Sequence, residues 1–375
     1  MIPAPKPDQP SPEPHVPLAV VCSLDAVLRD SVATGLLLDA PDLAVLRYDL
    51  DAEGDLRRLV LGGGAVLENA PVVLEHECIA CTMREDALPV LEALAQEARW
   101  EAIALLLPVA ADPAVVMRTL IPRLERLRAG LVAAVVDADS AAQDLLGDAT
   151  LTERSLCWGE GDERSVGEAL AAQIEYVDLV ALVGDPAGPG AELIEHLRAP
   201  DQLLLDNAHD VTLALLTDGA HDLGTAGQRI DPAAVEAHHG PAEHGTWTLD
   251  LVSDRPFHPD RFLEHAERLG AGRLRGRGHF WFPTRPGTIC QWDGAGGQVS
   301  LGAHGFAGTE DPTTRLVVTG VDPADAQRVR EAFEDCLLTA QEWQAGLSPW
   351  LGREDDLTPW LGERTAAAAY GSDAA

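Results

Sequence analysis

The chain has 375 residues, of which 46% are hydrophobic, and a formal net charge of −34 at pH 7. This length suffices for two domains with cores of their own. No apolar run approaches the roughly 18 residues of a membrane span, the proline-rich start lacks a signal core, and the six cysteines are scattered. We therefore expect a cytoplasmic protein that associates with no membrane. The negative charge repels nucleic acids, so we expect no DNA partner. The same charge either attracts cations and basic proteins or serves only to keep the chain in solution.

The first part of the chain alternates strand and helix patterns. Residues 1–17 carry seven prolines and are expected to form a disordered tail. Between residues 18 and 206, short apolar runs predict strands at 18–22, 43–48, 72–74, 102–107, 131–136 and 177–183. Helical spacing predicts helices at 31–39, 85–98, 115–127 and 166–174. Apolar strands that alternate with helices indicate a mostly parallel sheet with helices on both faces.

The second part has a different pattern. Residues 207–245 are rich in Gly, Pro, Asp and His and are predicted to be a linker. Residues 246–343 predict a smaller α+β domain with a mainly antiparallel sheet, and residues 344–375 a polar tail. In that tail Trp350 and Trp360 stand in two similar short motifs. These form either a docking motif or, as we favour, two tryptophans that close the domain.

Several motifs resemble the CobW family. RPFHPDRF at 255–262, LRGRGHFW at 274–281, TRP at 284–286, GAGG at 294–297 and CLLT at 336–339 resemble the CobW C-terminal domain in order and spacing. CIACTMRED at 78–86, ADP at 111–113 and VVDA at 135–138 resemble the family's GTPase domain. The resemblance covers most of residues 18–343. It implies a P-loop-NTPase-like domain followed by a CobW C-terminal domain.

The place of the family's phosphate loop, from Ser23 to Ser31, departs from the pattern. A phosphate loop needs glycines, whose amides close around the phosphates, and a lysine that neutralises charge. The glycine positions hold Leu24, Val27 and Arg29, and the lysine position holds Asp30. The carboxylate of Asp30 would repel a phosphate. The only lysine of the chain, Lys6, lies far upstream.

Two further nucleotide motifs of the family are also missing. The acidic residue and the glycine of the second-metal strand correspond to Leu106 and Val109. The guanine-reading positions hold Val183, Gly184 and Pro186, so the base loses its carboxylate acceptor. We therefore expect no bound GTP or Mg²⁺, no catalytic residue and no GTP hydrolysis. A working GTPase remains the competing hypothesis, because the family is known for that activity.

One cysteine motif retains chemistry. Cys78 and Cys81 are spaced so that both thiolates can bind one zinc ion from a turn. His76 or Glu75 is the candidate third ligand, and Glu77 or a water the fourth. Mixed thiolate, imidazole and carboxylate ligands suit zinc better than harder ions. The alternatives are two inherited thiols without a metal, or a redox dithiol.

Two other residue sets are weaker candidates. One is a set of linker histidines that either bind zinc or are simply solvated: His221, His238, His239 and His244. The other is an island of arginines that bind rRNA phosphates or an acidic protein, or pair with the domain's own carboxylates: Arg261, Arg268, Arg273, Arg275, Arg277 and Arg285. The remaining cysteines, Cys22, Cys157, Cys290 and Cys336, are expected to pack in the core.

The altered phosphate loop and the His-x-Cys-x-x-Cys motif are similar to those of the actinobacterial CobW-like factor that recruits the hibernation-promoting factor to ribosomes during zinc limitation. This resemblance implies a non-hydrolysing protein of zinc homeostasis whose partner is the ribosome or that factor. The alternative is a zinc metallochaperone that delivers zinc from Cys78 and Cys81 to a client protein.

Overall fold

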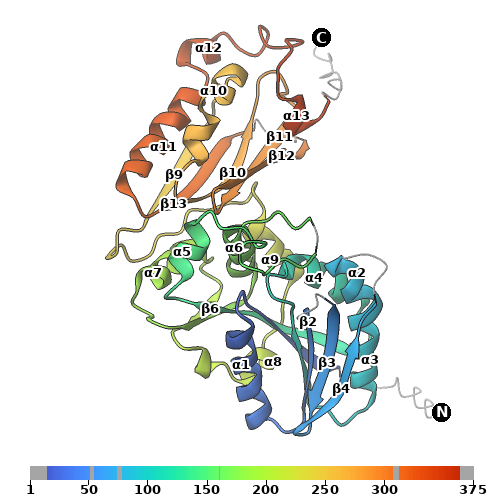
Figure 1. The fold of residues 1–375 in the computed structure, drawn as a ribbon. Helices are drawn as coiled ribbons and strands as arrows, with labels where there is room; N and C mark the ends of the chain where they lie inside the picture. The colour runs from blue at the N-terminus through green and yellow to red at the C-terminus, as the bar shows by residue number, and fades with distance from the viewer. Residues whose placement is uncertain (1–14, 51–54, 74–77, 160, 307–311, 364–375) are drawn as a thin grey trace, which may run out of the picture.

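The computed structural model describes residues 15–50, 55–73, 78–159, 161–306 and 312–363. These residues form two domains, each built on one β-sheet (Figure 1). The tail predicted at residues 1–17 lies mostly outside the described residues. Its end is ordered, because Val16 and Pro17 belong to the first strand, β1.

The sheet of the first domain has eight strands in the order β4-β3-β2-β5-β1-β6-β7-β8. The strands are β1 (Val16–Cys22), β2 (Leu43–Leu50), β3 (Leu56–Gly62), β4 (Ala65–Pro71), β5 (Ala102–Leu106), β6 (Leu127–Asp137), β7 (Leu179–Val183) and β8 (Leu203–Leu205). Six of them run parallel, and β3 and β4 form an antiparallel hairpin at one edge. The predicted mostly parallel sheet is therefore confirmed. The strand expected at 72–74 is wrong, because β4 ends at Pro71.

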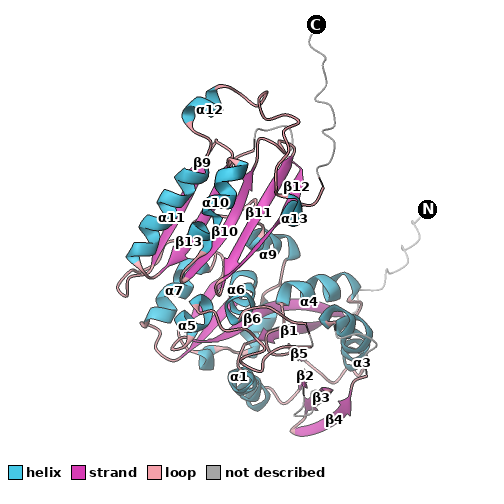
Figure 2. Ribbon diagram, turned by 45° about the horizontal axis from the view of Figure 1, so that its top comes forward, coloured by secondary structure: helices cyan, strands magenta, loops and turns pink. Residues whose placement is uncertain are grey.

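Helices cover both faces of this sheet (Figure 2). Alternate residues of β1 face opposite ways: Leu18 and Val20 point to one core, and Ala19 and Val21 to the other. The first core is completed by η1 (Met83–Ala87), α3 (Leu88–Gln96), α4 (Pro113–Leu120), α5 (Ala141–Leu146), α6 (Val166–Tyr176), α7 (Pro189–Leu197) and α9 (Leu223–Ile230). The second core is completed by α1 (Ala26–Asp39), η3 (Ala208–Asp210) and α8 (Leu213–Asp218). The short helices α2 (Ile79–Thr82) and η2 (Ile121–Arg123) precede η1 and follow α4.

The segment 207–245, predicted to be a linker, is instead part of the first domain. Its helices α8 and α9 pack on opposite faces of the sheet, where Leu216 and Ala226 are fully buried. Each helix has only six to eight residues, which is too short for a stable helix in isolation. Packing against the sheet therefore stabilises both helices.

The second domain has a five-stranded antiparallel sheet in the order β12-β11-β10-β13-β9. Its strands are β9 (Trp247–Ser253), β10 (Leu274–Trp281), β11 (Thr288–Ala295), β12 (Gln298–Phe306) and β13 (Thr314–Gly320). Helices α10 (Pro259–Gly270) and α11 (Pro323–Cys336) pack against each other and share its core with the sheet. Phe257, Phe262, Phe280 and Phe282 stack in that core with ring centroids 5.2 to 5.6 Å apart. This confirms the predicted α+β domain.

Part of the expected polar tail belongs to the second domain. After α12 (Ala340–Gln344), Trp350 is buried against the ring of His258, whereas Trp360 in α13 (Thr358–Leu361) remains half exposed. The carboxylate of Asp355 pairs with the buried guanidinium of Arg285 at 2.7 Å. Residues 344–363 therefore close the domain, and only one of the two tryptophans is buried.

A buried ion cluster joins the two domains. Glu175 at the end of α6 is 3% exposed and accepts two hydrogen bonds of 2.7 Å from Arg275 in β10. Arg277 binds the same carboxylate at 3.2 Å, and Asp293 also pairs with Arg275. Burial alone would raise the pKa of Glu175, but the charges of Arg275 and Arg277 hold its pKa below the ordinary value.

The turn between β11 and β12 makes the second contact between the domains. A Cβ added to Gly296 would lie 2.3 Å from the hydroxyl of Ser165, the residue that caps α6. A Cβ added to Gly167 would lie 2.7 Å from the backbone nitrogen of Gly296. Glycine is therefore required on both sides, because the two backbones approach too closely for a side chain.

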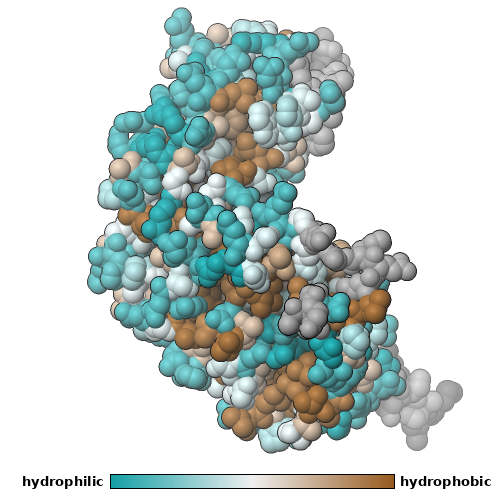
Figure 3. All heavy atoms as spheres, in the orientation of Figure 1, coloured by the Kyte–Doolittle hydropathy of each residue, from teal (hydrophilic) through white to brown (hydrophobic). Residues whose placement is uncertain are grey.

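The surface is mainly hydrophilic on the face in Figure 3, with hydrophobic patches in the lower, first domain. None of the helices in the described part of the chain has the length and hydropathy that a membrane span requires.

Replacing Glu175 by Gln should lower the free energy of unfolding by about 3 kcal/mol, because two guanidinium groups lose a buried partner. Urea unfolding at pH 7 measures this loss. The matched control is Glu334→Gln, whose exposed pair with Arg255 should contribute less than about 1 kcal/mol. The contribution of Glu175 is complete above about pH 4 and is lost as the pH falls through its lowered folded pKa. Equal losses in the two variants would show that the cluster does not stabilise the joint.

Candidate functional site

The turn between β1 and α1 stands where the phosphate loop was expected. Asp25 is the N-cap of α1, and its carboxylate accepts hydrogen bonds from the amides of Val27 at 2.6 Å and Leu28 at 3.2 Å. Ser23 is buried and donates a hydrogen bond of 2.7 Å to the carbonyl of Val135. Amides at a helix N-terminus are the groups that bind phosphate in a phosphate loop. Here a side chain of the same turn already occupies them.

Behind the turn, Arg29 is fully buried in a network of charges. Its guanidinium contacts the carbonyl of Leu107 at 2.5 Å and the carboxylates of Asp30 and Asp49 at 2.9 Å. Arg47 pairs with the same two carboxylates at 2.6 and 2.8 Å. The sequence predicted that Asp30 would face the phosphate position. The structure instead pairs Asp30 with two arginines, and Asp25 places its carboxylate at the helix terminus.

The other nucleotide positions also lack binding groups. Leu106 is buried at the end of β5, and Val183 ends β7. Gly184 has a φ of +99°, and a Cβ added there would lie 2.7 Å from the carboxylate of Asp139. Ser31 is exposed on α1. The residues present therefore do not fit GTP with Mg²⁺.

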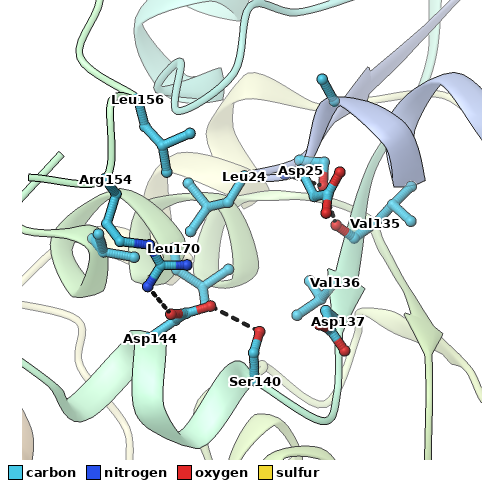
Figure 4. Close-up of a pocket in the computed structure, with 13 residues that line it drawn as sticks. Leu24, Asp25, Val135, Val136, Asp137, Ser140, Asp144, Arg154, Leu156 and Leu170 are labelled. Carbon is cyan, nitrogen blue, oxygen red and sulfur yellow. Dashed lines mark hydrogen bonds and ion pairs between the residues drawn. The ribbon is translucent and has the colours of Figure 1, made fainter. Parts of the chain in front are cut away.

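A cavity of about 370 Å³ nevertheless lies beside this turn, over the carboxyl ends of β1 and β6 (Figure 4). Its charged lining consists of Asp25, Asp137, Asp144 and Arg154. Arg154 pairs with Asp144 at 3.1 Å, and Ser140 donates a hydrogen bond of 2.8 Å to the same carboxylate. The sequence analysis missed these residues. The available signal was Asp25 itself, an acidic residue at a helix start.

Cys78 and Cys81 lie together at the start of the helix that runs from α2 into α3. Cys78 is the N-cap of α2, and its carbonyl accepts hydrogen bonds from the amide and the hydroxyl of Thr82. Two hydrogen bonds from Cys81 lower the pKa of the Cys78 thiol. The bond from the amide of Cys81 has the larger effect, and the bond from its thiol has the smaller one. Arg84 lies 3.7 Å from the sulfur of Cys81. Cys78 also lines an open pocket of about 460 Å³ beside Trp158.

This pair supplies two thiolate donors of the kind that zinc prefers. His76, Glu75 and Glu77, the other predicted ligands, lie outside the described residues. Among the residues that are described, no group of three or more His, Cys, Asp or Glu side chains is arranged to hold a metal. The pair therefore has the chemistry of two sulfur ligands, and the zinc site that the sequence places here stays a prediction.

The other cysteines and the histidines have mainly structural surroundings. Cys22, Cys290 and Cys336 are buried as predicted, and burial raises the pKa of Cys290 and of Cys336 to about 12. His221 is buried between Asp178 at 2.7 Å and the hydroxyl of Tyr176 at 3.1 Å. The expectation that this histidine is solvated is therefore wrong.

The predicted arginine island is paired within the chain. Arg261 binds Glu342, Arg268 binds Asp335, Arg285 binds Asp355, and Arg275 and Arg277 bind Glu175. Arg273 donates to the carbonyl of Ala142. These arginines therefore serve the second domain and its joint with the first, and the rRNA alternative has no unpaired cluster in its support.

Comparison with known proteins identifies the second domain. Residues 246–337 match the family model of the cobalamin synthesis protein cobW C-terminal domain. The second domain is therefore similar to the CobW C-terminal domain. The zinc-regulated GTPase metalloprotein activator 1 of Dictyostelium discoideum is 23% identical over 75% of this chain and 69% of its own. A zinc chaperone of Mycobacterium tuberculosis is 23% identical over 86% of this chain and 90% of its own.

The Zn(II)-bound YjiA GTPase of E. coli aligns with 86% of this chain and 99% of that chain at 14% identity. Its TM-score of 0.36 is too low for this likeness to bear on function. The sequence similarities support a relation of this chain to the CobW family. The two relatives given above both have names that refer to zinc.

Replacing Cys78 and Cys81 together by Ser should abolish zinc binding, because both sulfur ligands are lost. We expect about one zinc ion per chain in the dialysed wild type and almost none in the double variant, measured by mass spectrometry of the metal. Cys290→Ala is the matched control, since Cys290 lies in the core of the second domain, away from this pair. Retention of stoichiometric zinc by the double variant would place the site elsewhere.

Proposed function

We propose that this chain is a zinc-homeostasis protein on the CobW plan that does not use GTP. The observation that carries the proposal is the carboxylate of Asp25, which occupies the amides at the start of α1. A triphosphate would have to displace this carboxylate and then approach it closely, and like charges repel strongly at a partly buried site.

The surrounding residues support the same proposal. Arg29 has a bulky side chain where a phosphate loop needs glycine, and it is held by Asp30, Asp49 and the carbonyl of Leu107. The guanidinium of Arg29 is therefore directed away from the cavity and into the protein. Among the described residues, Arg154 supplies the guanidinium that lines the cavity, and it pairs with Asp144.

GTP with Mg²⁺ should leave the thermal unfolding midpoint of the purified chain unchanged and should give no binding heat in calorimetry. A ligand at a thousand times its Kd stabilises a protein by about 4 kcal/mol, so even micromolar binding is detectable at millimolar GTP. Titration of zinc into the same preparation is the positive control. Submicromolar affinity for GTP would contradict the proposal.

We further propose that the chain recruits the hibernation-promoting factor to the ribosome when zinc is scarce. The support is the sequence resemblance to that CobW-like factor, together with the carboxylate of Asp25 at the amides that start α1. An adaptor needs a stable surface and no hydrolysis cycle, which agrees with the closed β1–α1 turn.

Ribosomes sedimented from zinc-starved cells should carry this chain, and those from zinc-fed cells should carry much less. Immunoblots of the gradient fractions measure this, with the hibernation-promoting factor followed in parallel. The Cys78→Ser, Cys81→Ser variant tests whether the response to zinc passes through the thiol pair. Absence of the chain from ribosomes in both states, with the factor present, would refute the adaptor role.

Zinc delivery to a client protein is the second candidate function. It is favoured by the lowered pKa of Cys78, which makes the thiolate available to a metal, and by the open pocket that this residue lines. The two functions differ in whether the metal leaves the chain: a metallochaperone transfers its zinc, whereas a sensor retains or releases it with the zinc supply.

A further inference from the structure

The cavity beside the β1–α1 turn lies where open α/β sheets bind their ligands. From β1 the chain passes through α1 to β2 on one side of the sheet, whereas from β6 it continues to β7 on the other side. The crevice beyond the carboxyl ends of β1 and β6 is therefore the switch point of the topology. The cavity of about 370 Å³ is placed there, at the lower end of the range for small-molecule pockets.

The charges of the lining determine which ligands this cavity accepts. Three carboxylates, from Asp25, Asp137 and Asp144, face it against one guanidinium, from Arg154. Within the described part of the chain, neither Asp25 nor Asp137 forms an ion pair. The remaining wall is largely apolar and includes Leu24, Leu156, Val166 and Leu170. This combination suits a positively charged group on a short apolar chain and disfavours a phosphate.

Arg154 contributes the protein's own cation to the lining of the cavity. It comes from the loop between α5 and α6 and is 48% exposed, yet its guanidinium reaches the carboxylate of Asp144, which is 11% exposed. Figure 4 shows this guanidinium directed at Asp144, with Asp137 on the other side of the cavity. One oxygen of Asp137 accepts the amide of Asp139 at 3.0 Å, and Asp144 is already satisfied by Ser140 and Arg154. Within the described residues, the other oxygen of Asp137 accepts no hydrogen bond and is therefore available to a ligand.

We propose that this cavity binds a small organic cation, an ammonium or guanidinium group on a short aliphatic chain. The cationic head pairs with Asp137 and Asp25, and the aliphatic part lies along Leu24, Leu156 and Leu170. The proposed site thus lies at the place in the fold where a phosphate site would lie, but it prefers cations to anions. The inference shares Asp25 with the proposal that the chain does not use GTP, but it involves neither Cys78 nor Cys81, so loss of agmatine binding and loss of zinc binding are separate outcomes.

Isothermal titration of agmatine into the purified full-length chain, at near-physiological salt, tests the proposal. We expect saturable binding of one molecule per chain. Asp137→Asn should weaken it at least tenfold, because the amide keeps the hydrogen bond to Asp139 but removes the charge. Arg154→Ala should leave binding intact or strengthen it several-fold, because it removes a competing cation. 1-Pentanol and inorganic phosphate should not bind.

The matched control is Asp206→Asn, which removes one exposed charge after β8, outside this cavity. It should leave agmatine binding unchanged and thereby separates the site from general attraction to an acidic chain. Circular dichroism and the unfolding midpoint verify that Asp137→Asn is folded. Three results would overturn the proposal: no saturable binding of agmatine, equal weakening by Asp137→Asn and Asp206→Asn, or tighter binding of phosphate than of agmatine.

Discussion

The hydrogen bonds from the first amides of α1 to the carboxylate of Asp25 determine which ligands the turn after β1 can bind. These donors can serve a phosphate or a side chain, but not both at once. Because the side chain holds them, the turn is complete without a ligand, and Arg29 is free to bury its charge against Asp30 and Asp49. The cavity that remains beside the turn is then left with acidic groups. The first domain thus combines a mostly parallel sheet covered by helices on both faces with an acidic cap at the turn that follows β1.

The sequence predicted the larger part of the fold, because buried parallel strands are continuous apolar runs and the motifs of the second domain are specific. It missed elements whose signal is weak or was not used. The hairpin of β3 and β4 turns at Gly63 and Gly64, both at positive φ, which is a hairpin signal that the sequence does contain. Helices α8 and α9 could not be predicted from composition, because their formation depends on a sheet face that the sequence does not display.

At the candidate site the sequence shows a departure from the family pattern, but it does not show the detailed geometry. The helix was expected to start at residue 31, whereas α1 starts at Ala26. This difference of about one and a half turns places Asp25 at the cap and turns Asp30 toward Arg29 and Arg47. Local spacing was sufficient for Cys78 and Cys81, since two thiols three residues apart meet at a helix start. The acidic cavity needed the tertiary structure, because Asp25, Asp137, Asp144 and Arg154 come from separate segments of the chain.

The contact of Gly296 with Ser165 and Gly167 has a mechanical consequence. Side chains at a joint can slide or change rotamer, so they allow neighbouring domains to swing. Backbone atoms packed against backbone atoms cannot rearrange in this way. The buried carboxylate of Glu175 makes a further contact between the same two domains. The two contacts lie at opposite ends of one helix, α6, because Ser165 caps its start and Glu175 lies near its end. A side chain at Gly167 or Gly296 would therefore push the second domain away from the helix that also carries the ion cluster.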